Sequence, residues 1–219
     1  MRTASNTGAV KLRSRGFTLV EVLVVAVISI VILALLSDVF IQALQRTHDG
    51  RIRVDMQQRA IFALGHWERD IEKTSSRAMV VKPGDPLCVA MTQAAAINDN
   101  GSVSWNPQII CWAYLKAARK WQRETYPPAA PAFAREPSLT TPYLPTYSEL
   151  DSLTSQVGGS EKIMCDNVED FSLTDRSGNT AALKEQPLIF KLKLRSPLST
   201  PNRFAEFTID RRYTLRNSF

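Results

Sequence analysis

The first part of the chain is dominated by one long apolar stretch. The uncharged run Val22–Ser37 has 16 residues and is extended by Phe17–Val20 before it and Val39–Ile41 after it. With these flanks the stretch approaches the roughly 20 apolar residues that cross a bilayer as a helix. No small-x-small cleavage sequence closes the run, so the pattern favours a retained transmembrane helix over residues 17–41 and not a removed signal peptide.

Apolar residues continue at helical spacing beyond this stretch. They recur at intervals of three and four residues, which is typical of one buried helix face. These positions are Ile52, Met56, Ala60, Ala63, Leu64, Trp67 and Ile71. No proline occurs before Pro83, so we expect one helix over about Phe17–Ser75, with residues 42–78 as an amphipathic half lying against a globular domain. The polar sequence His48–Arg53 could bend or loosen this helix around Gly50.

The pattern changes at Met79 to short apolar stretches separated by Pro, Gly, Asn and Asp. The stretches that predict strands are MVV, LCVAM, QIICWAYL, KIMCDNVEDFSLT, PLIFKLKLRS and AEFTIDRRYTLRN. The turn Asn98–Ser102 predicts that LCVAM and QIICWAYL pair as a hairpin. We expect the proline-rich segment 126–147 to be an extended excursion over the surface. The predicted fold is therefore α+β: one long N-terminal helix packed on an antiparallel β-sheet domain over residues 79–219.

The net charge of +6 would suit a nucleic-acid-binding protein if it lay on a folded domain. Four basic residues, Arg2, Lys11, Arg13 and Arg15, instead fall in the first 16 residues, which contain no acid. The rest of the chain carries 23 basic and 21 acidic side chains. We therefore expect no nucleic-acid partner. Because the basic residues precede the apolar stretch, the positive-inside rule predicts a cytoplasmic N-terminus and an exported domain.

One carboxylate, Glu21, lies near the front of the apolar stretch. A lone carboxylate in the membrane costs about 2.5–3.5 kcal/mol, and such groups usually have a partner and a role. No Lys or Arg follows within the stretch to pair with it. The simpler alternative is that Glu21 sits at the membrane interface as a helix N-terminal residue favoured by the macrodipole.

The residues around Glu21 carry a resemblance. The sequence Gly16-Phe17-Thr18-Leu19-Val20-Glu21 resembles the type III signal of type IV pilins and type II secretion pseudopilins. The resemblance implies that residues 1–16 are a prepilin leader, which a prepilin peptidase cuts between Gly16 and Phe17 before methylating the new amine of Phe17. Glu21 would then pair with the amine of its own or a neighbouring subunit. This ion pair would stabilise a subunit only in the correct axial position in the filament.

Later segments resemble one class within this family. Residues Ala60–Met79, the sequence IMCDNVEDFSLT and the ending YTLRNSF are similar to PilW-type minor pilins, and pseudopilin J of type II secretion is a close cousin. The resemblance implies a single-pass inner-membrane protein with a periplasmic domain that enters a pilus. Its implied partners are other minor pilins and the major pilin, in a tip complex that primes the filament.

No catalytic or nucleotide-binding motif occurs in the sequence, so we expect no enzyme activity, no cofactor and no small-molecule substrate. Cys88, Cys111 and Cys165 lie far apart without CxxC spacing, which argues against a metal site. On the hairpin model Cys88 and Cys111 occupy neighbouring strands and form the preferred disulfide. Cys165 is the competing partner, and three buried free thiols are the third possibility.

Two other functions remain open. The first is a type II secretion pseudopilin at the pseudopilus tip, which would use the same N-terminal chemistry in a different machine. The second is a membrane-tethered adhesin or DNA receptor, which a basic or aromatic patch on the exported domain would favour.

Overall fold

The computed structural model describes residues 18–127, 139–155, 162–180, 183 and 185–215. The chain divides into two compact units, Met1–Thr47 and His48–Phe219. Helix α1 (Leu19–Glu72) contributes residues to both. This helix confirms the predicted one within the described residues, and it continues through Gly50 without a break in its helical assignment.

The two stretches of α1 differ in burial. Every described residue from Thr18 to His48 is exposed. In the second stretch, the positions predicted to form one buried face do so, with Ile52 partly buried and the others buried. Asp70 is a buried member of this face that the apolar pattern does not include.

A five-stranded antiparallel sheet begins soon after α1, with a short 3-10 turn, η1 (Ser76–Ala78), between them. Its order follows the chain, β1-β2-β3-β4-β5. The strands are β1 (Met79–Lys82), β2 (Leu87–Ile97), β3 (Val103–Leu115), β4 (Lys120–Tyr126) and β5 (Lys162–Cys165). The predicted β2–β3 hairpin is confirmed, because Gly101 N–H donates to the Asn98 carbonyl and Asn98 N–H to the Ser102 carbonyl in the turn.

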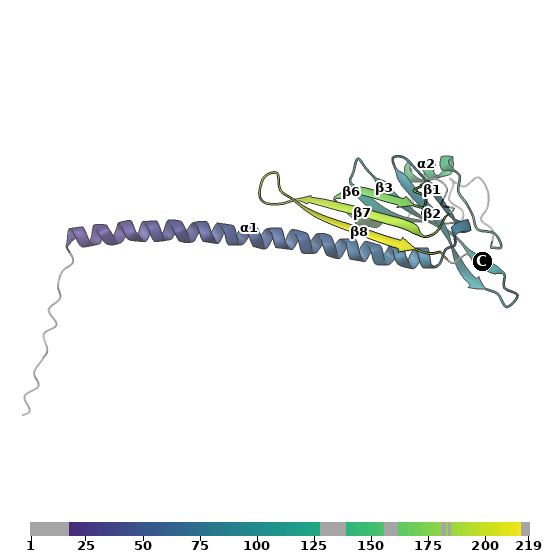
Figure 1. Cartoon of the computed structure of the whole chain (residues 1–219), viewed down its shortest axis with the longest axis horizontal. Coiled ribbons are helices and arrows are strands. Elements are labelled where there is room, and N and C mark those ends of the chain that lie inside the picture. Colours follow the sequence, from purple (N-terminus) through teal and green to yellow (C-terminus); the bar gives the residue numbers. More distant parts are fainter. Residues whose placement is uncertain (1–17, 128–138, 156–161, 181–182, 184, 216–219) are drawn as a thin grey trace, which may run out of the picture. The chain divides into compact units, whose positions relative to one another are not determined.

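A second, three-stranded antiparallel sheet holds β6 (Val168–Thr174), β7 (Leu188–Pro197) and β8 (Phe204–Tyr213). Figure 1 shows these strands side by side in green to yellow. The single strand predicted from KIMCDNVEDFSLT is wrong, since Asp166 and Asn167 separate β5 in one sheet from β6 in the other. Asn167 has a φ of 59°, a left-handed conformation that asparagine tolerates and that turns the chain between the sheets.

The core lies where the second stretch of α1 meets both sheets. Trp67 of the helix is fully buried and contacts Trp112 and Trp121 of the larger sheet, with ring centroids 5.5 and 5.9 Å away. It also contacts Phe190 of the smaller sheet at 5.3 Å. One aromatic side chain therefore joins all three layers, and aromatic contacts of this kind dominate core energetics.

The other face of the larger sheet carries a second apolar cluster under α2 (Tyr147–Ser155). Tyr143 is buried in this cluster and donates through its hydroxyl to Glu149 at 2.6 Å. The expectation that segment 126–147 only crosses the surface is therefore wrong for Tyr143, for the buried Pro145 and for Tyr126, which ends β4 and is also buried. Residues 128–138 of that segment lie outside the described residues. Because both faces of the sheet are covered, β4 has polar Gln122 and Glu124 buried beside Trp121, which hides its strand pattern in the sequence.

Candidate processing and assembly segment

The predicted cleavage site lies just before the described part of the structure. Gly16 and Phe17 fall outside the described residues, and the first described residue is Thr18.

Thr18 and Glu21 form a capping box at the start of α1. The backbone N–H and the hydroxyl of Thr18 donate to Glu21 Oε2 at 2.8 and 3.0 Å, and the Glu21 N–H donates back to Thr18 Oγ1 at 3.3 Å. This is the reciprocal Thr-x-x-Glu arrangement that satisfies the free donors of a helix N-terminus. Within a single chain, Glu21 is thus an exposed capping residue, as the simpler of the two sequence interpretations predicts, and the Thr-x-x-Glu spacing was a readable signal for it.

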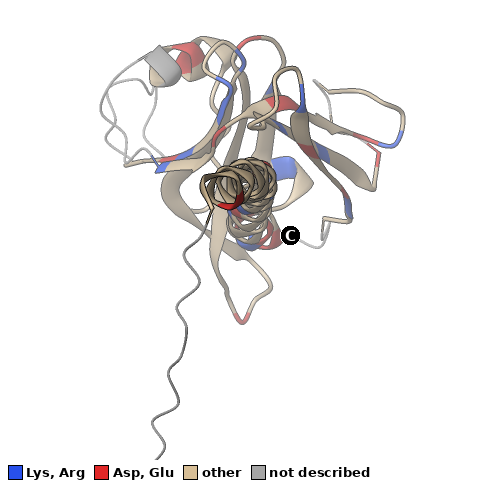
Figure 2. Cartoon of the chain, turned by 90° about the vertical axis from the view of Figure 1, so that its left-hand side faces the viewer, with Lys and Arg blue, Asp and Glu red and all other residues tan. Residues whose placement is uncertain are grey.

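The helix beyond the cap presents apolar side chains on all sides. Large aliphatic residues from Leu19 to Leu44 are each about half exposed or more, and the helix contains a span apolar enough to cross a membrane, with a mean hydropathy of 3.2. In Figure 2, where acidic residues are red and basic ones blue, this part of the helix is almost entirely tan. Ser37 and Thr47 donate to the carbonyls of Leu33 and Ala43, which satisfies their hydroxyls inside the helix, as a bilayer requires.

Asp70 attaches the second stretch of α1 to the larger sheet. Its two carboxylate oxygens accept from Arg123 Nε at 2.7 Å and Nη2 at 3.1 Å. They also accept from Trp112 Nε1 at 2.9 Å and Gln93 Nε2 at 3.1 Å. Sequence reasoning missed this residue, because its three partners come from strands 23 to 53 positions away and no local pattern links them.

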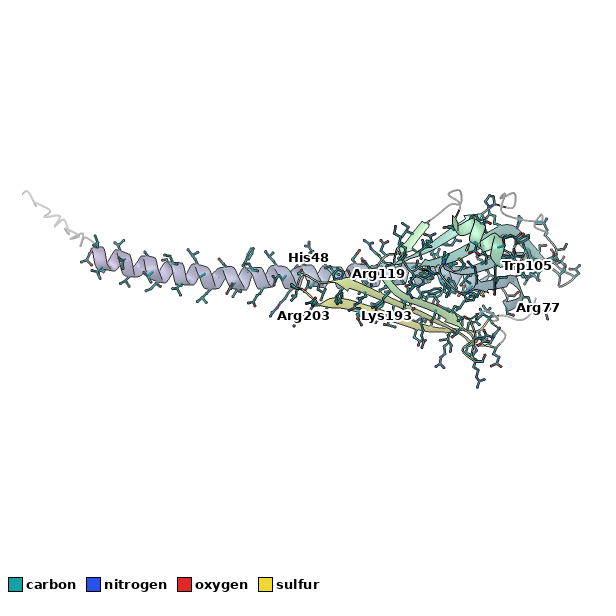
Figure 3. The ribbon with its side chains drawn as sticks, turned by 90° about the horizontal axis from the view of Figure 1, so that it is seen from above. His48, Arg77, Trp105, Arg119, Lys193 and Arg203 are labelled. Carbon is teal, nitrogen blue, oxygen red and sulfur yellow. The ribbon has the colours of Figure 1, made fainter. Side chains whose placement is uncertain are left out.

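Weaker polar contacts tie the rest of this stretch to the smaller sheet. The Tyr213 hydroxyl donates to Glu68 at 3.2 Å, and the Ser199 N–H in the β7–β8 loop donates to Asp49 at 2.9 Å. Figure 3 shows the labelled His48 and Arg203 at the same end of the sheet domain, opposite the end that holds Trp105. The contacts at Asp49 and Glu68 therefore fasten the helix near both ends of the smaller sheet.

The three cysteines are buried free thiols in this structure. Cys88 pairs in register with Ala113, and Cys111 with Ala90, so the two cysteines are diagonal neighbours on one face of the β2–β3 hairpin. The side-chain hydrogen bond between Cys111 and Cys88, which stabilises the protonated form of Cys111, raises the pKa of the Cys111 thiol, and burial raises it further. Cys165 belongs to the other apolar cluster, next to the helix. The predicted neighbouring strands for Cys88 and Cys111 are confirmed, and their disulfide stays a prediction.

Residues 11–37 match the family model of the prokaryotic N-terminal methylation motif. The matched segment includes Gly16, Phe17 and Glu21, and it covers the cap and most of the exposed apolar helix. The match supports a type IV pilin-like family, either pilin or pseudopilin, and points to a structural protein and not an enzyme. It fits membrane anchoring, processing by a prepilin peptidase and assembly with other pilins. A search of curated proteins found no match to the chain.

Proposed function

We propose that the protein is a PilW-type minor pilin that joins other minor pilins in a complex priming a type IV pilus. The observation that carries the proposal is that two consecutive stretches of one helix differ in burial. Its first stretch, which holds the methylation motif, exposes every apolar side chain, and its second stretch is packed into a sheet domain. Among the described residues nothing buries the first stretch, which suits a segment that moves from a bilayer into a bundle of subunit helices.

The proposed division of the chain follows from this role. Residues 1–16 are the leader, residues 17–41 cross the inner membrane and later assemble, residues 42–78 form the amphipathic half, and residues 79–219 form the periplasmic domain. Cleavage before the apolar stretch, and not after it, keeps the anchor. It also exposes the α-amine of Phe17, four residues before Glu21, and the prepilin peptidase would then methylate that amine.

In the proposed mechanism Glu21 sets the axial position of each subunit relative to its neighbour in the filament. In the isolated chain its oxygen is held by Thr18, so the carboxylate has local donors before assembly. In the filament it would accept from the Phe17 amine, either its own or that of a neighbouring subunit. A charge in apolar surroundings is stabilised only when its partner is correctly placed, so a misregistered subunit would be rejected.

Mass spectrometry of the native N-terminus tests the class directly. We expect a mature chain that begins with N-methyl-phenylalanine at Phe17. The substitution Gly16→Ala should leave an unprocessed precursor longer by the 16-residue leader, and no pili. A Gly16→Ala chain that matures normally and supports pili would show that the signal is misread.

The type II secretion pseudopilin remains the competing function, because the methylation motif is common to both machines. Deletion separates the two: loss of twitching motility with normal exoprotein secretion supports the pilus, and the reverse supports the pseudopilus. The adhesin or DNA-receptor alternative predicts that the exported domain binds DNA in a salt-sensitive manner, and binding measured at two salt concentrations tests it.

We also propose that Cys88 and Cys111 form a disulfide in the exported domain. The two thiols lose two electrons and two protons to a protein disulfide of the export compartment, which is reduced to a dithiol. Both thiols are buried, so oxidation precedes completion of the fold. Peptide mapping without reductant should link the segments holding Cys88 and Cys111. A link from either cysteine to Cys165, or three free thiols, would overturn the pairing.

A further inference from the structure

The first stretch of α1, residues 19–47, carries three charged side chains. They are Glu21, Asp38 and Arg46, and all three are exposed. Among the described residues, neither Asp38 nor Arg46 forms an ion pair. Cleavage before Phe17 would add a fourth charge, the α-amine of that residue. The stretch would then hold two positive and two negative groups, which is the set that two ion pairs need.

Asp38 and Arg46 do not pair within one helix, because their spacing is too large. They are eight positions apart, which is about 12 Å along the axis and about 80° around it. Charged side chains on one helix meet at a spacing of three or four positions. Asp38 lies roughly 28 Å beyond Leu19, at the end of a bilayer-spanning length, where water hydrates both charges before assembly. Packing between helices removes that water, and each charge then needs a partner.

The helix presents these charges on two neighbouring faces. Glu21 and Arg46 are 25 positions apart, which is about 20° short of seven full turns, so both project from one face. Asp38 projects about 80° away from Arg46. One helix can therefore turn Glu21 and Arg46 toward one neighbour and Asp38 toward another.

A parallel second copy complements these charges when it is displaced along the axis. In register, each Asp38 would stand level with the other Asp38, and the like charges would repel. A copy displaced by four positions toward the C-terminal end brings its Phe17 level with Glu21, and at eight positions its Asp38 comes level with Arg46. A displacement between these values, about 6–12 Å, serves both pairs. Side chains of a helix lean toward its N-terminus, so the long Arg46 side chain reaches back to the Asp38 of the displaced copy.

The contact joins two different faces of the same chain. One copy contributes Glu21 and Arg46, and the next copy contributes its amine and Asp38. A heterologous contact of this kind can repeat from copy to copy along a filament, because each copy keeps one face of each type free for the next.

We propose that Asp38 and Arg46 form an ion pair between two parallel copies of this chain that are displaced by four to eight helical positions. This rests on the proposed function and adds a second pair to that of Glu21. The pair also makes the contact selective, because a neighbouring helix without a carboxylate at this height would leave the Arg46 guanidinium buried without a partner.

Photocrosslinking of the full-length chain in its own cells tests the displacement. p-Benzoylphenylalanine replaces Leu35 in one strain and Leu33 in the control strain, and both leucines are 62% exposed. Leu35 points within about 40° of Glu21 and Arg46, whereas Leu33 points about 120° or more away from both. We expect position 35 to capture a second copy of the chain. Peptide mass spectrometry should place the adduct at residues 27–31 of that copy, four to eight positions before residue 35, and position 33 should give no such adduct.

Charge reversal then tests the ion pair. Asp38→Arg or Arg46→Asp alone should lower the yield of the position-35 adduct about tenfold, because like charges then face each other. The double variant should restore the yield, since the pair forms again with its signs exchanged. Asp99→Arg and Arg77→Asp are matched controls, because both residues are exposed and lie in the other unit, His48–Phe219; they should leave the yield unchanged.

The amount of mature chain in the membrane normalises each yield, so a variant that inserts poorly does not imitate a broken contact. Asp38→Asn and Arg46→Gln remove the charges without reversing them and should give intermediate yields. An adduct in register at residue 35, capture of a different pilin only, no adduct at all, or a double variant as poor as the single ones would each overturn the proposal.

The proposed function has a separate readout. If the N-terminus carries N-methyl-phenylalanine and the chain is found in pili, but position 35 captures no displaced second copy, only the ion-pair proposal fails. If the N-terminus is unmethylated, the proposed function fails whatever the crosslinks show.

Discussion

The two stretches of helix α1 carry comparable apolar side chains but bury them in different ways. In residues 48–72, the helix turns one face onto two sheets, and seven of its residues are buried. In residues 19–47, none of the residues is buried and apolar side chains occur all round the helix. A helix that is apolar on all sides needs a surrounding solvent or partner that is apolar on all sides. The first stretch therefore needs apolar surroundings that the described part of the chain does not supply, whereas the second finds them in the two sheets.

One carboxylate from each stretch, Asp70 and Glu21, shows the same difference. Asp70 is 6% exposed and accepts hydrogen bonds from three side chains that lie far away in the sequence. Glu21 is exposed, and among the described residues it accepts hydrogen bonds from Thr18, three residues away. Asp70 is thus part of the fold of one chain, while Glu21 is free to exchange a local partner for one in a neighbouring chain. The predictions below separate these two dependences.

The largest expected effect is on the free energy of unfolding of the sheet domain, from Trp67→Ala. We expect a loss of about 3–5 kcal/mol, since the substitution leaves a cavity among Trp112, Trp121 and Phe190. The matched change in the first stretch, Leu33→Ala, should leave this free energy unchanged, because Leu33 is 62% exposed. Denaturant unfolding in detergent, followed by tryptophan fluorescence, measures both, because all four tryptophans lie in the unit His48–Phe219. Equal losses in the two variants would contradict the comparison.

Asp70→Asn should lower the free energy of unfolding of the sheet domain somewhat less than Trp67→Ala does. It leaves the Arg123 guanidinium without its carboxylate, and removing one partner of a buried pair costs about 3–5 kcal/mol. We expect the lower end of this range, because the Arg123 side chain is 23% exposed and can recover some hydration. Adding Arg123→Met should recover part of the loss, as measured in a double-mutant cycle. A double variant no more stable than Asp70→Asn would show that the pair does not act as a unit.

Much of this contrast was predictable from the sequence. The intervals of three and four at Met56, Ala60 and Trp67 predict the buried helix face, because a helix places such residues on one side. The β2–β3 hairpin follows from a local turn signal at Asn98–Ser102. In both cases the information lies within a few neighbouring positions, so one sequence suffices.

The missed features depend on contacts between distant segments. The Asp70 cluster joins α1 to β2, β3 and β4, and strand β4 itself is hidden by the buried polar residues Gln122 and Glu124. The switch between sheets at Asn167 interrupts a run that reads as one strand. Tertiary partners decide each of these features, and periodicity carries no information about partners.

A smaller difference concerns pH. Burial raises the pKa of the Cys165 thiol in the domain to about 12, while an unfolded chain has its ordinary value near 9. Between these values the unfolded state has lost a proton that the native state keeps, so stability falls as the pH rises. The reduced domain should therefore lose up to about 1.4 kcal/mol per pH unit from this group above pH 9. Cys165→Ala should reduce the slope of the unfolding free energy against pH, and an unchanged slope would exclude this thiol as its source.

The smallest expected effect on the domain comes from Glu21→Ala. Within the described residues its hydrogen bonds go to Thr18. The loss should therefore be confined to the helix cap, and the unfolding free energy of the sheet domain should change by less than about 0.5 kcal/mol. The chain should still be cleaved at Gly16, because the leader and its glycine are intact, but it should fail to enter pili efficiently. Unfolding measurements on the purified chain and its abundance in sheared pili give the two readouts. Normal incorporation would remove the register role of Glu21, whereas a destabilised domain would show that the two stretches of α1 are coupled within one chain. The proposed separation, in which Asp70 is needed for folding and Glu21 for assembly, requires a stable domain together with failed assembly.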